Sequence, residues 1–171
     1  MIETWRWRRD VPACALLFTV LLMNGTGAHA APCEPAGAAR VTVDLAPPSD
    51  KTIAGVKIDL DYPDDRLKIP GFGDAPDVKL RVTGFPEGFF GAPNDLDDDL
   101  IVALAGTAAL PRGAIFTVEF DRCKGGPMPT PKDFRCKVEE ASTDTGVLVE
   151  GTTCSVRVLE GSDTKTTTKS K

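Results

Sequence analysis

The chain has 171 residues with 20 basic and 25 acidic side chains, a formal net charge of −5, and one histidine. An acidic chain without a basic cluster is a poor candidate for nucleic-acid binding, because phosphate neutralisation supplies much of that affinity. The only histidine, His29, and both tryptophans lie before residue 30.

The first 30 residues have the pattern of a secretory signal peptide. Arginines precede an uncharged run from Val11 to Met23, and a small-x-small site, Ala28–Ala30, follows it. The run has 13 residues, too few to span a bilayer, which takes roughly 20. We therefore expect an exported protein that begins at Ala31 and does not insert into a membrane.

Removing residues 1–30 leaves 17 basic and 23 acidic side chains, a net charge of −6, and no histidine. A Ser-His-Asp or Cys-His nucleophile pair of the usual kind is then excluded. An enzyme would need carboxylates as acid and base, as in glycoside cleavage. We expect no enzyme, because the available carboxylates occupy outward strand positions and turns, where solvation explains them: Asp59, Asp61, Asp64, Asp65, Glu139 and Glu140.

Alternating apolar residues predict short strands along the rest of the chain. Val41, Val43 and Leu45 alternate with polar residues, and the pattern is most regular from Val56 to Tyr62. The same period returns at residues 80–82, 116–120 and 156–158.

The six apolar residues 100–105 do not alternate. A short buried strand fits them, and so does a helix opened by Asp97–Asp99. The Ile101-Val102 pair and the following Gly106 favour the strand.

Turn-forming residues separate these runs, so the sequence predicts one all-β sandwich or barrel over residues 31–161. The last ten residues, 162–171, are polar and contain no apolar side chain; we expect a disordered tail there. The turns are expected at residues 47–50, 62–65, 70–71, 84–93, 111–113 and 125–131.

The turn segment 84–93 contains three phenylalanines, Phe85, Phe89 and Phe90. They could form a contact surface for a protein or a sugar. The favoured alternative is that Phe85, together with Phe89 or Phe90, plugs one end of the sandwich. Sugar platforms generally use Trp or Tyr, and the one tyrosine, Tyr62, alternates with core residues.

The run from Asn94 to Leu100 is the densest group of oxygen ligands and is a candidate calcium site. It does not follow the EF-hand loop, because Leu100 takes the place of the glycine and Gly106 that of the final carboxylate. A solvated turn between strands is the favoured interpretation, and no other cofactor is expected. The candidate ligands are Asn94, Asp95, Asp97, Asp98 and Asp99.

Four cysteines remain after residue 30: Cys33, Cys123, Cys136 and Cys154. An even number in an exported chain predicts two disulfides, with three possible connectivities. A metal site is less favoured, because no two of these cysteines form a C-x-x-C pair.

The order of the segments resembles the cohesin family of secreted bacterial proteins. Residues 54–67 are similar to its second strand and turn, and residues 100–120 to its late core. Residues 41–45 and 151–158 stand where the first and closing strands of that family stand.

The resemblance implies a nine-stranded jelly-roll sandwich at the bacterial surface or outside the cell. It implies that the first and last strands lie side by side and parallel, and hence the disulfides Cys33–Cys154 and Cys123–Cys136. It also implies a dockerin-bearing protein as the partner, bound through one face of the sandwich. Polysaccharide binding is the alternative function, and a structural or adhesion role without a dockerin is the third. The single copy and the four cysteines depart from the family pattern.

Overall fold

A computed structural model describes residues 33–96 and 98–160 of the chain. The expected signal peptide and polar tail lie outside the described residues.

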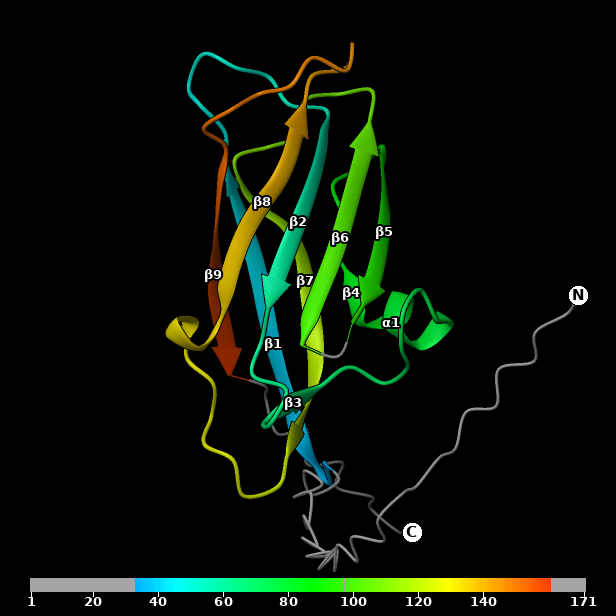
Figure 1. Cartoon of the computed structure of the whole chain (residues 1–171), viewed down its shortest axis with the longest axis vertical. Coiled ribbons are helices and arrows are strands. Elements are labelled where there is room, and N and C mark those ends of the chain that lie inside the picture. The colour runs from blue at the N-terminus through cyan, green and yellow to red at the C-terminus, as the bar shows by residue number, and fades with distance from the viewer. Residues whose placement is uncertain (1–32, 97, 161–171) are drawn as a thin grey trace, which may run out of the picture.

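Within the described residues, nine strands form two antiparallel sheets that pack face to face (Figure 1). One sheet has the order β3-β7-β1-β9, with β4 also paired to β7, and the other has the order β5-β6-β2-β8. The expected all-β sandwich is confirmed. The strands are β1 (Pro35–Ala46), β2 (Gly55–Asp61), β3 (Leu67–Lys68), β4 (Val82–Thr83), β5 (Phe89–Asp95), β6 (Asp99–Gly106), β7 (Gly113–Cys123), β8 (Arg135–Ser142) and β9 (Thr153–Glu160).

The five-stranded sheet is only four strands wide. The two-residue strands β3 and β4 lie along the same edge of β7, with Leu67 opposite Arg122 and Val82 opposite Val118. Between them stands the short helix α1 (Pro76–Arg81), and a 3-10 turn, η1 (Pro131–Asp133), precedes β8.

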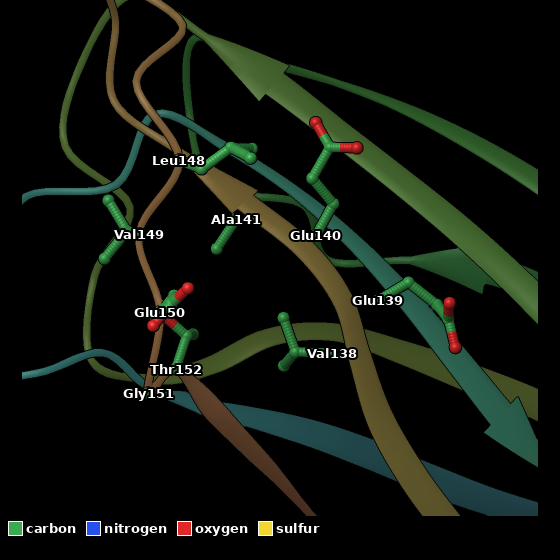
Figure 2. A pocket seen from close by; sticks show the side chains of 9 residues that line it. All are labelled: Val138, Glu139, Glu140, Ala141, Leu148, Val149, Glu150, Gly151 and Thr152. Atoms are coloured by element: carbon green, nitrogen blue, oxygen red, sulfur yellow. The ribbon is translucent and has the colours of Figure 1, made fainter.

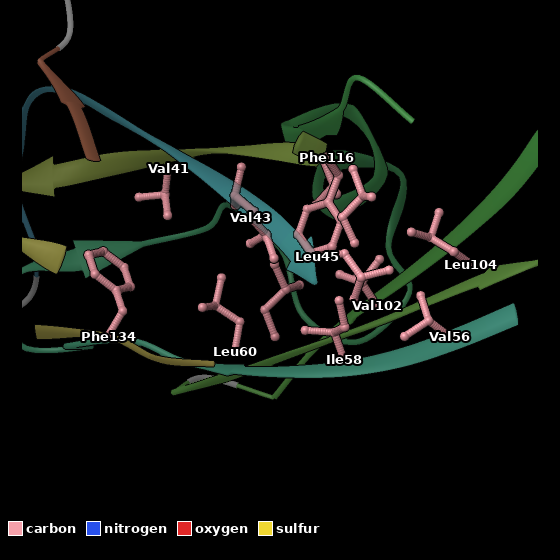
Figure 3. Packing of buried hydrophobic residues seen from close by; sticks show 14 of the residues in the cluster. Val41, Val43, Leu45, Val56, Ile58, Leu60, Val102, Leu104, Phe116 and Phe134 are labelled. Carbon is pink, nitrogen blue, oxygen red and sulfur yellow. The ribbon is translucent and has the colours of Figure 1, made fainter. Parts of the chain in front are cut away.

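The core lies between the two sheets and is formed by the strand residues that point inward, which alternate along each strand with outward residues (Figure 3). Aromatic rings fill the end near β3, where Tyr62 lies 4.8 Å from Phe120 between ring centroids, and Phe134 lies 6.1 Å from Phe120. Each large apolar side chain buried in this way contributes about 1.5–3 kcal/mol. The labelled core residues in Figure 3 are Val41, Val43, Leu45, Val56, Ile58, Leu60, Val102, Leu104, Phe116 and Phe134.

The non-alternating run 100–105 forms most of β6, so the strand interpretation is confirmed. The expected strand at 80–82 is wrong in its first half, because Leu80 and Arg81 end helix α1 and only Val82 enters a strand. A proline at the first helical position, which needs no N–H partner, and Asp77 in the first turn favour this helix.

The expected turn at 84–93 is also partly wrong, because β5 begins at Phe89. The glycines and prolines of residues 84–93 favoured a turn, so the strand was not predicted. Pro93 is tolerated because β5 is an edge strand, where a missing N–H breaks no central ladder.

The first and last strands lie side by side, but they are antiparallel and not parallel as expected. Leu45, near the end of β1, pairs with Cys154, and Pro35, at its start, pairs with Cys123 of β7. Ten residues of strand extend about 33 Å, so Cys33 and Cys154 lie at opposite ends of the sandwich. A disulfide needs Cα atoms about 4.4–6.8 Å apart.

Both expected disulfide pairings are therefore wrong, although two bridges do form. Cys33 is joined to Cys123, with Cα atoms 4.9 Å apart, because the start of β1 pairs with the end of β7. Cys136 is joined to Cys154, with Cα atoms 5.8 Å apart, and this bridge links β8 of one sheet to β9 of the other.

Candidate protein-binding face

The outer face of the four-stranded sheet carries small apolar side chains on the half formed by β5 and β6. Register places Phe90 beside Ala105, Ala92 beside Ala103, and Asn94 beside Ile101, all pointing away from the core. Phe90 is 73% exposed. A large ring thus stands among short side chains at one end of a flat strand surface.

The other half of this face, formed by β2 and β8, is charged. The outward residues of β2 and β8 lie opposite one another in four cross-strand pairs. These are Gly55 with Ser142, Lys57 with Glu140, Asp59 with Lys137, and Asp61 with Arg135. Two shallow depressions mark the surface. One of ≈300 Å³ lies between Lys57, Ala103 and Glu140, and one of ≈260 Å³ lies between the Asp59–Lys137 and Asp61–Arg135 rows.

Carboxylates on this face outnumber the cations that neutralise them. Arg135 binds Asp61 at 2.6 Å. Asp99, which pairs with Asp61 across β2 and β6, lies in the field of neighbouring carboxylates. Its burial, followed by repulsion from Asp59, Asp98 and Asp61, raises the pKa of Asp99. The β2–β6 border therefore carries negative charge that Arg135 and Lys137 compensate only in part.

The outer face of the opposite sheet is arranged differently, because its arginines form ion pairs with carboxylates of the same face. Arg40 and Arg81 both bind Glu119 at 3.0 Å, and Arg81 also binds Asp121 at 3.0 Å. At the β1–β9 border Arg157 donates to Asp44 at 2.8 Å, and that hydrogen bond lowers the pKa of Asp44. Such pairs leave little charge for a partner.

The three predicted contact phenylalanines are divided between core and surface. Phe85 packs against Phe116, with ring centroids 6.2 Å apart, and Phe89 packs against the core cluster, so these two close one end of the sandwich. Phe90 points outward from β5. Glycine makes the division possible, because a Cβ on Gly91 would overlap the Phe85 ring and one on Gly106 would lie 2.7 Å from the ring of Phe89.

The four described candidate calcium ligands, Asn94, Asp95, Asp98 and Asp99, are not brought together as a group. Asp95 is 2% exposed and accepts a 2.7 Å hydrogen bond from the hydroxyl of Tyr62, inside the sandwich. Asn94 and Asp99 lie on the outer face, Asp98 is exposed, and Asp97 is outside the described residues. Among the described residues, no three Cys, Asp or Glu side chains are placed to hold a metal ion. Calcium binding stays a prediction.

Sequence reasoning missed most of this face. The carboxylates of β2, Asp59 and Asp61, were noted as outward positions, but Ala92, Ala103 and Ala105 carry no functional signal of their own. The strand register that brings them beside Phe90 is the missing information.

In the described part of the chain, no helix is long and apolar enough to cross a bilayer.

No protein-family model matches the sequence, and no curated protein matches it. Among solved structures, the chain is similar to a chain in the crystal structure of a type I cohesin–dockerin complex from Clostridium thermocellum. The two are 16% identical, with a TM-score of 0.45, over 68% of this chain and 83% of that chain.

Proposed function

We propose that residues 31–161 form an exported binding module that recognises a dockerin-type extracellular protein. The proposed contact surface is the outer face of the β5-β6-β2-β8 sheet. The observation that supports it most directly is Phe90, a ring 73% exposed among alanines on a flat strand surface. Exposed apolar surface rimmed by polar groups is typical of protein-interaction sites.

Charge supports the choice of this face over the opposite one. The β2–β6 border carries the carboxylates of Asp59, Asp61 and Asp99, against two cations, Arg135 bound to Asp61 and Lys137 opposite Asp59. Such a field speeds the encounter with a basic partner and selects against an acidic one. On the opposite face the arginines and carboxylates already neutralise each other.

Polysaccharide binding is less well supported than protein binding. Sugar platforms depend on aromatic rings with a polar edge. The described residues contain no tryptophan, and the one tyrosine, Tyr62, is 2% exposed with its hydroxyl bonded to Asp95. A structural or adhesive role without a dockerin is the third candidate.

The test is titration calorimetry of the purified chain against a panel of dockerin modules, with binding to insoluble cellulose and chitin measured in parallel. Phe90→Asp is the test variant. Leu159→Asp is its matched control, since Leu159 is 45% exposed on β9 of the opposite sheet. We expect saturable dockerin binding that Phe90→Asp weakens at least about 30-fold, as for a hot-spot aromatic residue. Retention on polysaccharide without dockerin binding would refute the proposal.

A further inference from the structure

A groove runs along one side of the molecule between β8 and residues 148–152, which lead into β9 (Figure 2). At its upper end the two segments are hydrogen-bonded, with the Val149 amide donating to the Ala141 carbonyl at 2.8 Å. At its lower end the Cys136–Cys154 disulfide joins them. Between these two fixed points the segments separate, and the opening has a volume of ≈360 Å³.

The floor of this groove is apolar. Val138 and Ala141 of β8 and Val149 of the facing segment all belong to the hydrophobic core or pack against it. At the lip, Val147 and Leu148 are 62% and 66% exposed. Ala141 and Val149 are themselves buried, so the apolar surface open to a partner is formed by the half-buried Val138 and by Leu148 at the lip.

The wall on the β8 side is the edge of a sheet, because the order β5-β6-β2-β8 ends there. The described residues that follow β8 pair with this edge only near its end, through the Val149–Ala141 bond and the Thr143–Val147 bond. An edge strand presents unpaired N–H and C=O groups that can accept another strand. From Cys136 to Glu140 the free edge extends about 13 Å, enough for a segment of about five residues.

Acidic residues outnumber basic ones around the groove, where Lys57 lies opposite Glu140 and Lys137 is bound to Glu139. Its lining residues include Glu139, Glu140 and Glu150 and no basic residue. Lys137, below the groove, binds Glu139 at 2.6 Å, and no ion pair engages Glu140 or Glu150 within the described residues. In Figure 2, Glu139 and Glu140 project from the side of β8 opposite to the floor.

We propose that this groove binds an extended, basic segment of another protein, which adds as a strand to the free edge of β8. Side chains alternate along a strand, so every second residue of the segment would face the apolar floor at Val138. The residues between them would lie on the outer face as cross-strand neighbours of Glu139 and Glu140, where opposite charges attract. The segment therefore alternates apolar and basic residues. Strand addition of this kind takes affinity from the main chain and specificity from alternate side chains.

The proposal does not depend on dockerin recognition, and its test uses a separate probe. Fluorescence polarisation of the labelled pentapeptide Lys-Val-Lys-Val-Lys is measured with the full exported chain. Glu-Val-Glu-Val-Glu and a peptide with N-methylated backbone serve as probe controls. We expect saturable binding of the basic peptide alone, and loss of binding on N-methylation because strand pairing needs the N–H groups.

Variants locate the contact. Glu140→Lys should weaken binding about tenfold, because a cross-strand attraction becomes a repulsion. Glu87→Lys makes the same charge change at an exposed position of another loop and should change binding less than twofold. Methyl NMR should show shifts at Val138 and Leu148. Equal weakening by both variants, equal binding of the acidic or methylated peptide, absence of saturable binding, or shifts confined to Ala103 and Ala105 would overturn the proposal.

Discussion

At the scale of single residues, two buried threonine hydroxyls differ in whether they have a hydrogen-bond partner. Thr42 of β1 is 6% exposed, and its hydroxyl lies 3.1 Å from that of Thr117 on β7. The hydroxyl of Thr152, in the wall of the groove, is buried and has no hydrogen-bond partner among the described residues. An unpaired buried hydroxyl costs free energy, whereas a paired one contributes to stability.

We therefore expect opposite effects from the same substitution. Thr152→Val should leave the free energy of unfolding unchanged or raise it by up to about 0.5 kcal/mol, because no bond is lost. Thr42→Val should lower it by about 1 kcal/mol, because Thr117 loses its partner. Urea unfolding followed by far-UV circular dichroism measures both. Equal destabilisation by the two substitutions would show that the Thr152 hydroxyl is bonded after all.

The three phenylalanines at 85, 89 and 90 show where single-residue prediction stops. The sequence indicated either a plug or a contact surface; the structure packs Phe85 and Phe89 against the core and leaves Phe90 exposed. Which ring does which depends on where β5 begins and on its pairing with β6, because a shift of one residue would exchange Phe89 and Phe90 between core and surface. The glycines that make room for Phe85 and Phe89 lie on strands, and one of them lies far along the chain.

At the scale of elements, regular alternation predicted β1, β2, β7 and β9 well, and β8 not at all. The reason is a bulge in β8. Ile58 pairs with Val138 and Lys57 with Glu140, so Glu139 is an extra residue in the ladder. Inward residues on either side of it, Val138 and Ala141, are three positions apart, and the period-2 signal disappears.

The disulfide pairing was wrong for a related reason, since it depended on strand direction. The expectation that β9 runs parallel to β1 placed Cys154 at the wrong end of the sandwich. This single error made both predicted bridges wrong. Cysteine spacing could not correct this, because four cysteines allow three connectivities whatever their spacing.

The two bridges close loops of very different length, with sequence separations of 90 and 18 residues. By chain entropy, removing the first (Cys33→Ala with Cys123→Ala) should cost about 4.6 kcal/mol. Removing the second (Cys136→Ala with Cys154→Ala) should cost about 3 kcal/mol. Urea unfolding of the two double variants measures the difference. Non-reducing peptide mapping is the control, and a peptide joining Cys123 to Cys136 would contradict the structure.

At the scale of the whole molecule, the two outer faces divide the charge unequally. The face of the β3-β7-β1-β9 sheet binds its arginines to its own carboxylates. The face of the β5-β6-β2-β8 sheet keeps carboxylates close together at Asp59, Asp61 and Asp99. The sequence shows the net negative charge but not this division, because residues from four strands make each face.

The burial of the Asp99 carboxylate, together with repulsion from the carboxylates around it, should lower the stability of the domain at neutral pH. The pKa of Asp99 is raised in the folded state, so folding favours its protonated form, and the penalty is present above that raised pKa. It disappears as the pH falls below the ordinary value of 3.8. Asp99→Asn, which resembles the protonated form, should therefore stabilise the domain at pH 7 by about 0.5 kcal/mol or less, given solvent screening. The gain should vanish near pH 3.

Thermal unfolding of the wild type and Asp99→Asn between pH 3 and pH 7 measures this difference, at low and at high salt. Asp144→Asn is the matched control, because Asp144 is exposed in the turn after β8 and has no ion pair among the described residues. High salt should shrink the gain of Asp99→Asn, since it screens repulsion between exposed carboxylates. A stability gain that is independent of pH, or equal in the two variants, would mean that the carboxylates around Asp99 do not destabilise the folded domain. If the gain follows the predicted pH and salt dependence, a basic partner that covers this face would relieve the same repulsion, so binding would be favoured by charge that folding leaves unpaired.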